Sequence, residues 1–178
     1  MKKFLALLAI SLLPLTATAH GPSGLKVIET VTIKADTAKI WALVKDFGAL
    51  EKWHPSVAST KLEQKKNEEG VDTTYRLLTL KDGGTIYERL GNIDEADLKI
   101  KYYIETGVLP VNDYYATIGV KAGPGAGETT VTWTARFYRK YKLNPPIPAG
   151  EDDESAINAV TGVLKTGLAN LKKVSENQ

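Results

Sequence analysis

The sequence of 178 residues lacks cysteine altogether, contains only two histidines and has almost no surplus of charge of either sign. Without cysteine there is no disulfide framework, thiol nucleophile, iron–sulfur cluster or cysteine-ligated zinc site. A formal net charge of +2 does not provide the clustered basic surplus of a nucleic-acid-binding surface. The length fits one domain whose core is large enough to fold without cross-links. Composition therefore excludes several classes of protein and identifies none.

The sequence also lacks the short motifs that carry common enzyme chemistry. The HExxH zinc motif, the GxSxG nucleophile motif, the P-loop and the dinucleotide-binding glycine pattern are all absent. The segment 123–127 is rich in glycine, but it lacks the strand–glycine–helix context of a phosphate site and is predicted to be a hairpin turn. His20 and His54 are too few for a metal site. We therefore expect no metal, no cofactor and no assigned catalytic residue.

Residues 1–19 have the pattern of a secretory signal peptide. Two lysines precede an apolar run over 4–15, and a segment of small residues ends at Ala19. The run is shorter than the roughly 20 residues of a membrane-spanning helix, so a membrane anchor is the less favoured interpretation. Cleavage after Ala19 would leave 20–178 as a single mature domain with equal numbers of basic and acidic residues and no membrane span. In a Gram-negative host this domain would be periplasmic.

Along the mature chain, apolar residues alternate with polar ones in seven segments, which predicts strands. These segments are 25–34, 57–65, 71–80, 85–93, 98–105, 114–121 and 129–138. Apolar residues at helical spacing predict a helix over 37–47, with Asp36 as its N-cap and Gly48 at its end, followed by a short helical segment over 49–53. A long helix with one apolar face follows the acidic residues 151–154 and runs to about 174.

Alternation in the predicted strands indicates which of their faces points inward. The even-numbered residues of 98–105 are apolar, as are the odd-numbered residues of 131–137. Short turns between the strands favour antiparallel pairing. A sheet with one apolar face buries that face best against the apolar stripe of the long helix. We therefore predict an α+β helix-grip fold, in which a curved seven-stranded antiparallel sheet wraps around the C-terminal helix and two short helices follow the first strand. Such a sheet usually leaves a cavity beside the helix.

Three segments stand out beside this order of elements. They are Ala35-Asp36-Thr37-Ala38-Lys39-Ile40-Trp41, Trp53-His54-Pro55 and Asp82-Gly83-Gly84-Thr85-Ile86-Tyr87-Glu88-Arg89-Leu90. Together they resemble the helix-grip (SRPBCC) superfamily, which includes START lipid-transfer domains, polyketide cyclases and plant abscisic-acid receptors. The resemblance covers essentially all of 25–175. Because this scaffold binds lipids, hormones and polyketides in different members, it implies the fold without fixing the function.

Three further segments are similar to the MxaD branch of this superfamily. They are His20-Gly21-Pro22, Asp46-Phe47-Gly48 and Leu109-Pro110-Val111. Members of this branch are exported, cysteine-free proteins linked to periplasmic methanol oxidation. The resemblance implies a non-enzymatic accessory that helps methanol dehydrogenase work with its cytochrome c partner and carries no cofactor, with room for a small apolar ligand. The alternatives are a cyclase- or hydrolase-like enzyme using Glu88 or His54 for proton transfer, and a lipid or isoprenoid carrier.

Glu88 is the most informative candidate for a ligand pocket. A three-residue turn at 82–84 would place Leu78 opposite Glu88, so that the carboxylate lies among apolar residues on the inner face. Arg76 shares that face, one diagonal step away. Since a buried carboxylate needs a partner or a raised pKa, Glu88 and Arg76 are either polar anchors of an apolar pocket or a structural ion pair. The abscisic-acid receptors resemble this stretch, and they use the matching acid to contact their ligand through water.

Aromatic residues complete the predicted pocket, either as its lining or as ordinary core. They are Trp41, Trp53, Tyr102, Tyr114 and Trp133. Trp53, at a helix-to-strand junction, is also placed for a pocket mouth or a partner interface. His54 beside it is a candidate general acid or base, or else a cap or surface group.

A second group of aromatic residues occupies strand positions that are predicted to point away from the core. It consists of Tyr87, Tyr103 and Tyr115, and Lys99 and Lys101 flank Tyr103. This face is predicted to be either a docking surface or a half-exposed sheet face whose tyrosines simply favour strands.

Overall fold

The structure is a computed structural model that describes residues 21–177. The predicted signal peptide over 1–19, its cleavage after Ala19 and the residue His20 lie outside the described residues. Within them the chain forms a strand, a helix, a short 3-10 helix, six further strands and a long helix. This order confirms the predicted α+β fold class.

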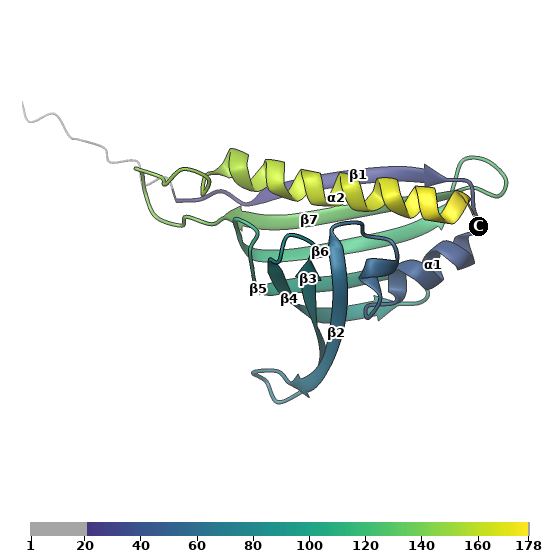
Figure 1. The fold of residues 1–178 in the computed structure, drawn as a ribbon, viewed down its shortest axis with the longest axis horizontal. Coiled ribbons are helices and arrows are strands. Elements are labelled where there is room, and N and C mark those ends of the chain that lie inside the picture. Colours follow the sequence, from purple (N-terminus) through teal and green to yellow (C-terminus); the bar gives the residue numbers. More distant parts are fainter. Residues whose placement is uncertain (1–20, 178) are drawn as a thin grey trace, which may run out of the picture.

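Seven strands form one antiparallel sheet. They are β1 Leu25–Ile33, β2 Val57–Lys66, β3 Asp72–Leu80, β4 Thr85–Asp94, β5 Lys99–Gly107, β6 Val111–Ala122 and β7 Thr129–Arg139. Their order across the sheet is β1-β7-β6-β5-β4-β3-β2, so the first and last strands pair. Figure 1 shows the curvature: β1 and β7 run along the molecule, whereas β2 crosses their direction steeply. The largest departure from the predicted bounds is β6, which starts early because a bulge before Tyr115 keeps the chain paired.

Helix α2 (Asp153–Glu176) lies along β1 and β7 (Figure 1). Asp152 caps its N-terminus by accepting a hydrogen bond from the Ser155 N–H at 2.7 Å, and this bond lowers the pKa of Asp152. The buried stripe of α2 consists of Ala156, Val160, Leu164, Gly167, Leu168, Leu171 and Ser175. The apolar spacing seen in the sequence therefore faces the sheet, as predicted.

Two short helical segments follow β1. Helix α1 (Thr37–Lys45) is capped by the Asp36 carboxylate, and a 3-10 helix, η1, covers Leu50–Lys52. Helix α1 ends at Lys45 with Asp46 as its C-cap, so Gly48 does not end it as the sequence predicts. A Cβ atom at position 48 would lie 2.8 Å from Cδ1 of Leu62 on β2. Because glycine has no side chain, Leu62 can pack against this part of the backbone.

The β3–β4 hairpin differs from its prediction by two residues in register. Arg76, rather than Leu78, lies directly opposite Glu88. The Leu80 N–H donates to the carbonyl of Gly84 at 2.8 Å, so the turn covers 81–83 in place of the predicted 82–84, and the Lys81 N–H donates outside the hairpin to the carbonyl of Ser56 at 2.9 Å. Since the shift is an even number of residues, the inward and outward faces of both strands stay as predicted.

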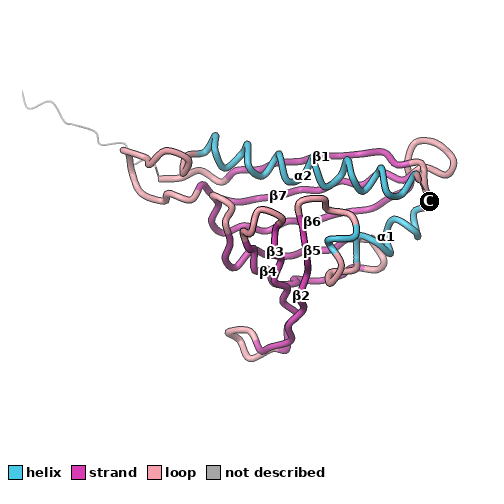
Figure 2. Tube along the Cα trace, in the orientation of Figure 1, coloured by secondary structure: helices cyan, strands magenta, loops and turns pink. Residues whose placement is uncertain are grey.

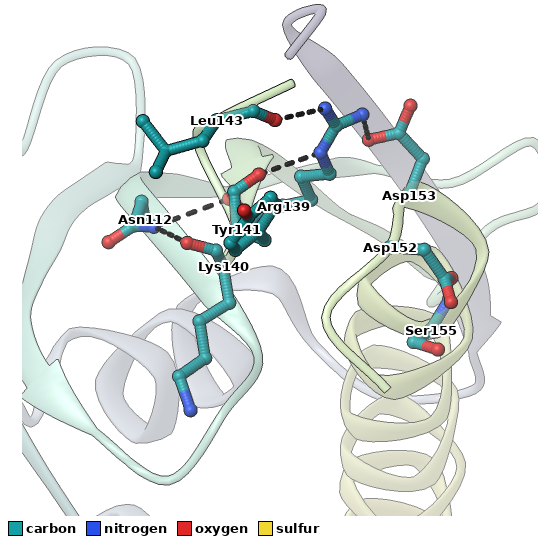
Figure 3. Close-up of polar contacts among 8 residues, drawn as sticks. All are labelled: Asn112, Arg139, Lys140, Tyr141, Leu143, Asp152, Asp153 and Ser155. Atoms are coloured by element: carbon teal, nitrogen blue, oxygen red, sulfur yellow. Dashed lines mark hydrogen bonds and ion pairs between the residues drawn. The ribbon is translucent and has the colours of Figure 1, made fainter. Parts of the chain in front are cut away.

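The end of the sheet far from the C-terminus is held by Arg139 on β7. Figure 2 shows the long loop between β7 and α2 at this end. The Arg139 guanidinium donates to the carbonyls of Tyr141 at 2.7 Å and Leu143 at 3.4 Å, and to Oδ1 of Asp153 on α2 at 3.3 Å (Figure 3). The Asn112 amide on β6 donates to the carbonyl of Arg139 at 3.3 Å. The β5–β6 hairpin is therefore tied to the loop that leads into α2.

Candidate ligand-binding cavity

Arg76 on β3 and Glu88 on β4 form an ion pair on the inner face of the sheet. Nε of Arg76 donates to Oε2 of Glu88 at 2.5 Å, and each side chain is only 5% exposed. A second guanidinium N–H donates to the carbonyl of Phe47 at 3.0 Å, and the Phe47 ring centroid lies 4.0 Å from the guanidinium carbon. The register therefore places the two charges side by side in the core.

Burial governs the charge state of this pair. Loss of water around Glu88 raises the pKa of its carboxyl group, and the positive charge of Arg76 acts in the opposite direction. Removing one partner of such a pair leaves an uncompensated buried charge and costs about 3–5 kcal/mol of stability. Arg76 and Glu88 are therefore stable in the core only together.

Glu88 also faces a cavity of about 60 Å³ between the sheet, the η1 segment and α2. Five of the predicted pocket residues line this cavity: Leu78, Glu88, Tyr102, Tyr114 and Trp133. The lining is completed by Leu50, His54, Ser56, Val57, Leu80, Ile86, Ile104, Leu109 and Val163. Most of these side chains are aliphatic or aromatic, so the cavity offers an apolar environment with few polar groups.

The volume of the cavity limits what it can hold. Pockets for drug-sized ligands measure about 300–1,000 Å³, whereas a single water needs roughly 10–15 Å³ of probe-occupied space. A cavity of about 60 Å³ therefore fits a few waters or a ligand of a few heavy atoms. A long lipid would require the walls to move apart.

Trp133, Tyr102 and Tyr114 form the aromatic wall. Nε1 of Trp133 donates to the hydroxyl of Tyr102 at 3.0 Å, and the rings of Tyr102 and Tyr114 lie 6.3 Å apart between centroids. Burial raises the pKa of both tyrosines far above the physiological range. Their hydroxyl groups therefore stay protonated and keep a hydrogen that they can donate.

His54 lies in the cavity wall with both ring nitrogens engaged. Nε2 lies 3.1 Å from the carbonyl of Val163 on α2, and Nδ1 accepts from the N–H of Ser56 at 3.3 Å. These partners fit a neutral ring that carries its proton on Nε2, and burial lowers the pKa of His54. His54 is thus a buried link to α2, and the expectation of a surface group is wrong.

Helix α2 approaches this histidine closely because residue 167 is glycine. A Cβ atom at Gly167 would lie 2.6 Å from Cδ2 of His54 and 2.9 Å from Cζ3 of Trp133. Both distances are shorter than a carbon atom tolerates. Gly167 therefore allows the imidazole and the indole to pack against the helix backbone.

The other three predicted pocket residues do not line the cavity. Arg76 stands behind the carboxylate with which it pairs. Trp53 is 2% exposed and packs edge-on against Trp133, with centroids 5.6 Å apart, so it belongs to the core and not to a pocket mouth. Trp41 on α1 donates from Nε1 to Glu95 in the β4–β5 turn at 2.6 Å and joins those two elements.

Some of the lining residues that the sequence analysis missed could have been found from a local sequence pattern, and others could not. Leu80, Ile86 and Ile104 share strand parity with residues already assigned to the pocket, so alternation alone could have added them. Val163 lies on the apolar face of α2. Leu109 sits in the β5–β6 turn, where no local pattern marks a residue as inward-facing.

No cluster of three or more histidine, cysteine, aspartate or glutamate side chains gathers between residues 21 and 177 in a way that could hold a metal ion. Over the same residues no helix is long and apolar enough to cross a membrane.

Comparison with known proteins identifies the family of this fold. Residues 25–176 match the sequence profile of the family described as polyketide cyclase / dehydrase and lipid transport. Among curated proteins, none shows significant similarity to the chain.

Solved structures share the architecture. The protein XoxI from Bacillus cereus is 29% identical with a TM-score of 0.68, over 84% of this chain and 94% of that one. An uncharacterized protein from Bacillus thuringiensis is 30% identical with a TM-score of 0.68, over 84% and 98%. A START superfamily protein from Mycobacterium smegmatis is 16% identical with a TM-score of 0.63, over 85% and 97%, and shares the fold alone. The chain thus belongs to the polyketide cyclase/dehydrase and lipid transport family, with the START-like fold that its sequence indicated.

Proposed function

We propose that the protein is a non-enzymatic binding protein that holds a small, largely apolar ligand in the cavity beside Glu88. One observation carries this proposal: Glu88 and His54, the two groups that the enzymatic alternative would use for proton transfer, already have partners. Glu88 is held by Arg76, and both ring nitrogens of His54 are hydrogen-bonded. A general acid or base must instead reach the proton of a substrate directly or through one water.

The size of the cavity separates this proposal from lipid or isoprenoid carriage. An apolar chain of lipid length needs several times the observed volume of about 60 Å³. The conformation described here favours a compact ligand whose apolar part meets Leu78 and Trp133. A single polar atom of that ligand would face the carboxylate of Glu88.

Native mass spectrometry of protein purified from its own host tests the ligand. We expect a bound small molecule on the native protein and none on Val57→Phe, which places a larger side chain in the cavity wall. The matched control Ile28→Phe adds the same ring on the exposed outer face of β1 and should keep the ligand. Empty spectra of the native protein, or a bound mass retained by a folded Val57→Phe, would overturn the proposal.

For the biological role of this binding protein, we infer that it is exported to the periplasm and serves there as an MxaD-like accessory of methanol dehydrogenase and its cytochrome c. The sequence segments at 20–22, 46–48 and 109–111 support this role, and so does the signal-peptide pattern of 1–19. The distant likeness to XoxI points in the same direction. Glu88 would then serve ligand binding and not catalysis.

Reconstituted electron transfer tests the accessory role. Adding the purified protein to methanol dehydrogenase and cytochrome c should speed cytochrome reduction, while the protein alone should turn over nothing. Unchanged kinetics over a range of protein concentrations would remove the accessory role and leave the cavity proposal to its own test. Turnover by the protein alone, lost in Glu88→Gln, would instead establish the enzymatic alternative.

A further inference from the structure

A single row of side chains crosses all seven strands on the outer face of the sheet. The strand registers place these residues side by side in the order Lys26, Arg136, Tyr115, Tyr103, Arg89, Tyr75 and Glu63. Apart from the acid at its end, this Tyr–Arg row contains only cations and tyrosines. It lies on the face of the sheet opposite α2, so the cavity does not use it.

Cations hold the tyrosine rings at the centre of the row. The guanidinium carbon of Arg89 lies 4.2 Å from the ring centroid of Tyr103. Nζ of Lys101 lies 5.1 Å from the Tyr103 centroid and 5.0 Å from the Tyr115 centroid. Such contacts restrict side chains that would otherwise be free at the surface. A partner that binds here therefore loses less conformational entropy to ordering these groups.

A second aromatic cluster continues the row towards β2. The rings of Tyr75 and Tyr87 stack with centroids 5.4 Å apart and planes 9° from parallel. Nζ of Lys65 lies 4.4 and 4.7 Å from their centroids, and the hydroxyl of Tyr87 donates to Glu63 at 2.7 Å. The faces of these rings are thus largely occupied by one another and by a cation, and Tyr75 is only 6% exposed, whereas Tyr87 is half-buried.

Two hollows follow the row. One, of about 660 Å³, extends to Lys140, and the other, of about 590 Å³, extends to Lys66. Both are lined by Arg89, Glu105 and Thr106, so they adjoin at the ion pair between Arg89 and Glu105, whose atoms lie 2.8 Å apart. Together they form a trough along the outer face that is floored by tyrosine rings.

The strand residues of the outer face carry more positive than negative charge, whereas the lining of the two hollows is balanced, with Lys65, Lys66, Arg89 and Lys140 against Glu68, Glu69, Glu105 and Asp113. The outward-facing strand residues include Lys26, Lys61, Lys65, Arg89, Lys99, Lys101, Lys121 and Arg136, against Glu63, Asp94 and Glu105. Basic and acidic residues are equal in number over 21–177. The positive excess therefore belongs to this face and is balanced by acids elsewhere.

We propose that the Tyr–Arg row and its trough form a docking surface for a protein partner with an acidic surface. Tyrosine and arginine are the residues enriched in the energetically dominant parts of protein interfaces. The positive excess steers an acidic partner and sets its orientation. The two hollows receive side chains that protrude from that partner. The Tyr–Arg row lies on the other face of the sheet from the cavity, and the inference does not rest on the proposed ligand.

The same observations disfavour two other anionic partners. Single-stranded nucleic acid binds by stacking its bases on open aromatic faces, whereas the faces of Tyr75 and Tyr87 are covered. A bilayer presents a flat surface, which does not fill two hollows that adjoin across an ion pair. A protein surface, with its own protrusions and carboxylates, fits both features.

Nuclear magnetic resonance titration with a synthetic glutamate-rich peptide tests the surface. The expected result is saturable binding, with shifts confined to the rings of Tyr75, Tyr103 and Tyr115 and to the Nε–H of Arg89. Affinity should fall steeply as the ionic strength rises from about 0.02 to 0.3 M. The double variant Lys101→Glu with Arg136→Glu should weaken binding at least tenfold.

The control carries the same change of net charge on the helices. Lys39→Glu combined with Lys173→Glu reverses two exposed lysines away from the outer face and should bind the peptide within about twofold of the native affinity, since charges beyond a Debye length are largely screened. Equal weakening by both double variants, absence of saturable binding, or shifts centred on α2 would overturn the proposal. So would tighter binding of phosphatidylglycerol vesicles or single-stranded DNA than of the peptide.

Discussion

Two glycines of α2 differ in their surroundings, one exposed and one packed against aromatic rings, so substitution of each by alanine should have opposite effects on stability. Gly162 is exposed, and a Cβ atom there would meet nothing within 4 Å. A Cβ atom at Gly167 would lie 2.6 Å from His54 and 2.9 Å from Trp133. Helix propensity favours alanine over glycine by about 1 kcal/mol at either position, so only packing distinguishes the two.

The size of each change in stability follows from comparing the gain in helix propensity with the cost of overpacking. Gly162→Ala should raise the free energy of unfolding by about 0.5–1 kcal/mol, since nothing opposes the gain in propensity. An extra methyl group in a close-packed region costs about 1–3 kcal/mol. Because its neighbours are two rigid rings and not the ends of flexible chains, Gly167→Ala should fall near the upper end of that range. The net result is a loss of about 1–2 kcal/mol.

Thermal and urea unfolding of the two variants provide the measurement. For a domain of this size, 1 kcal/mol shifts Tm by about 2–4 °C, so the melting temperatures should move apart in opposite directions from that of the native protein. The ring signals of His54 should also change in Gly167→Ala and not in Gly162→Ala. Stabilisation of both variants by similar amounts would refute the close contact between α2 and the rings of His54 and Trp133.

Four further predictions concern the cavity and the ion pair beside it. Because burial raises the pKa of Glu88, its stabilising contribution is present below its ordinary pKa of 4.5 and is lost as the pH rises through the folded value. Urea unfolding should therefore show the native protein losing stability relative to Glu88→Gln as the pH rises above 4.5, and a constant difference would contradict this. Burial lowers the pKa of His54, so the stability that its neutral ring contributes above the ordinary pKa of 6.5 should be lost as the pH falls through the folded value. An NMR titration should find the ring neutral at pH 6.5, and half-protonation there would argue for exposure. Arg76→Met strands a buried carboxylate and should cost about 3–5 kcal/mol, so a loss below about 1 kcal/mol would show that the pair is solvated. Leu78→Ala should cost about 2–5 kcal/mol and enlarge the cavity enough to bind xenon, whereas a smaller loss without xenon binding would mean that the walls collapse.

The sequence predicts the fold well because the signals that determine it are local. The alternation around Tyr102 and Trp133 sets which face of each strand points inward, and the spacing from Val160 to Leu171 sets the stripe of α2 that covers it. Both patterns reflect the side-chain periods of strands and helices, which do not depend on distant residues. The caps at Asp36 and Asp152 are local for the same reason.

The departures arise where distant parts of the chain meet. The predicted β3–β4 register fails because the turn begins one residue earlier, at Lys81, whose N–H bonds to Ser56 outside the hairpin. No residue near His54 in the sequence predicts that its ring lies against Gly167, because that contact depends on how α2 crosses the sheet. The position of Trp41, expected in the pocket, is likewise set by a hydrogen bond to Glu95 in a remote turn.

The docking surface shows the same limit at the scale of the whole sheet. Outward parity at Tyr103 is visible in the sequence, and so are its flanking lysines. The continuous row depends instead on the pairing of β1 with β7, which places Lys26 beside Arg136 across the full length of the domain. Long-range strand pairing of this kind leaves no periodic signal in either strand.

The cavity and the docking surface meet at one layer of side chains. Ile104, Leu109 and Tyr114 line both the inner cavity and the outer hollow of about 660 Å³. Leu109 lies in the β5–β6 hairpin, which Asn112 ties to the loop before α2. A partner seated in that hollow therefore touches the wall of the ligand site. It changes ligand affinity only if its own affinity differs between two arrangements of this hairpin. The two sites are tested separately, and the hairpin around Leu109 is the element through which one would act on the other.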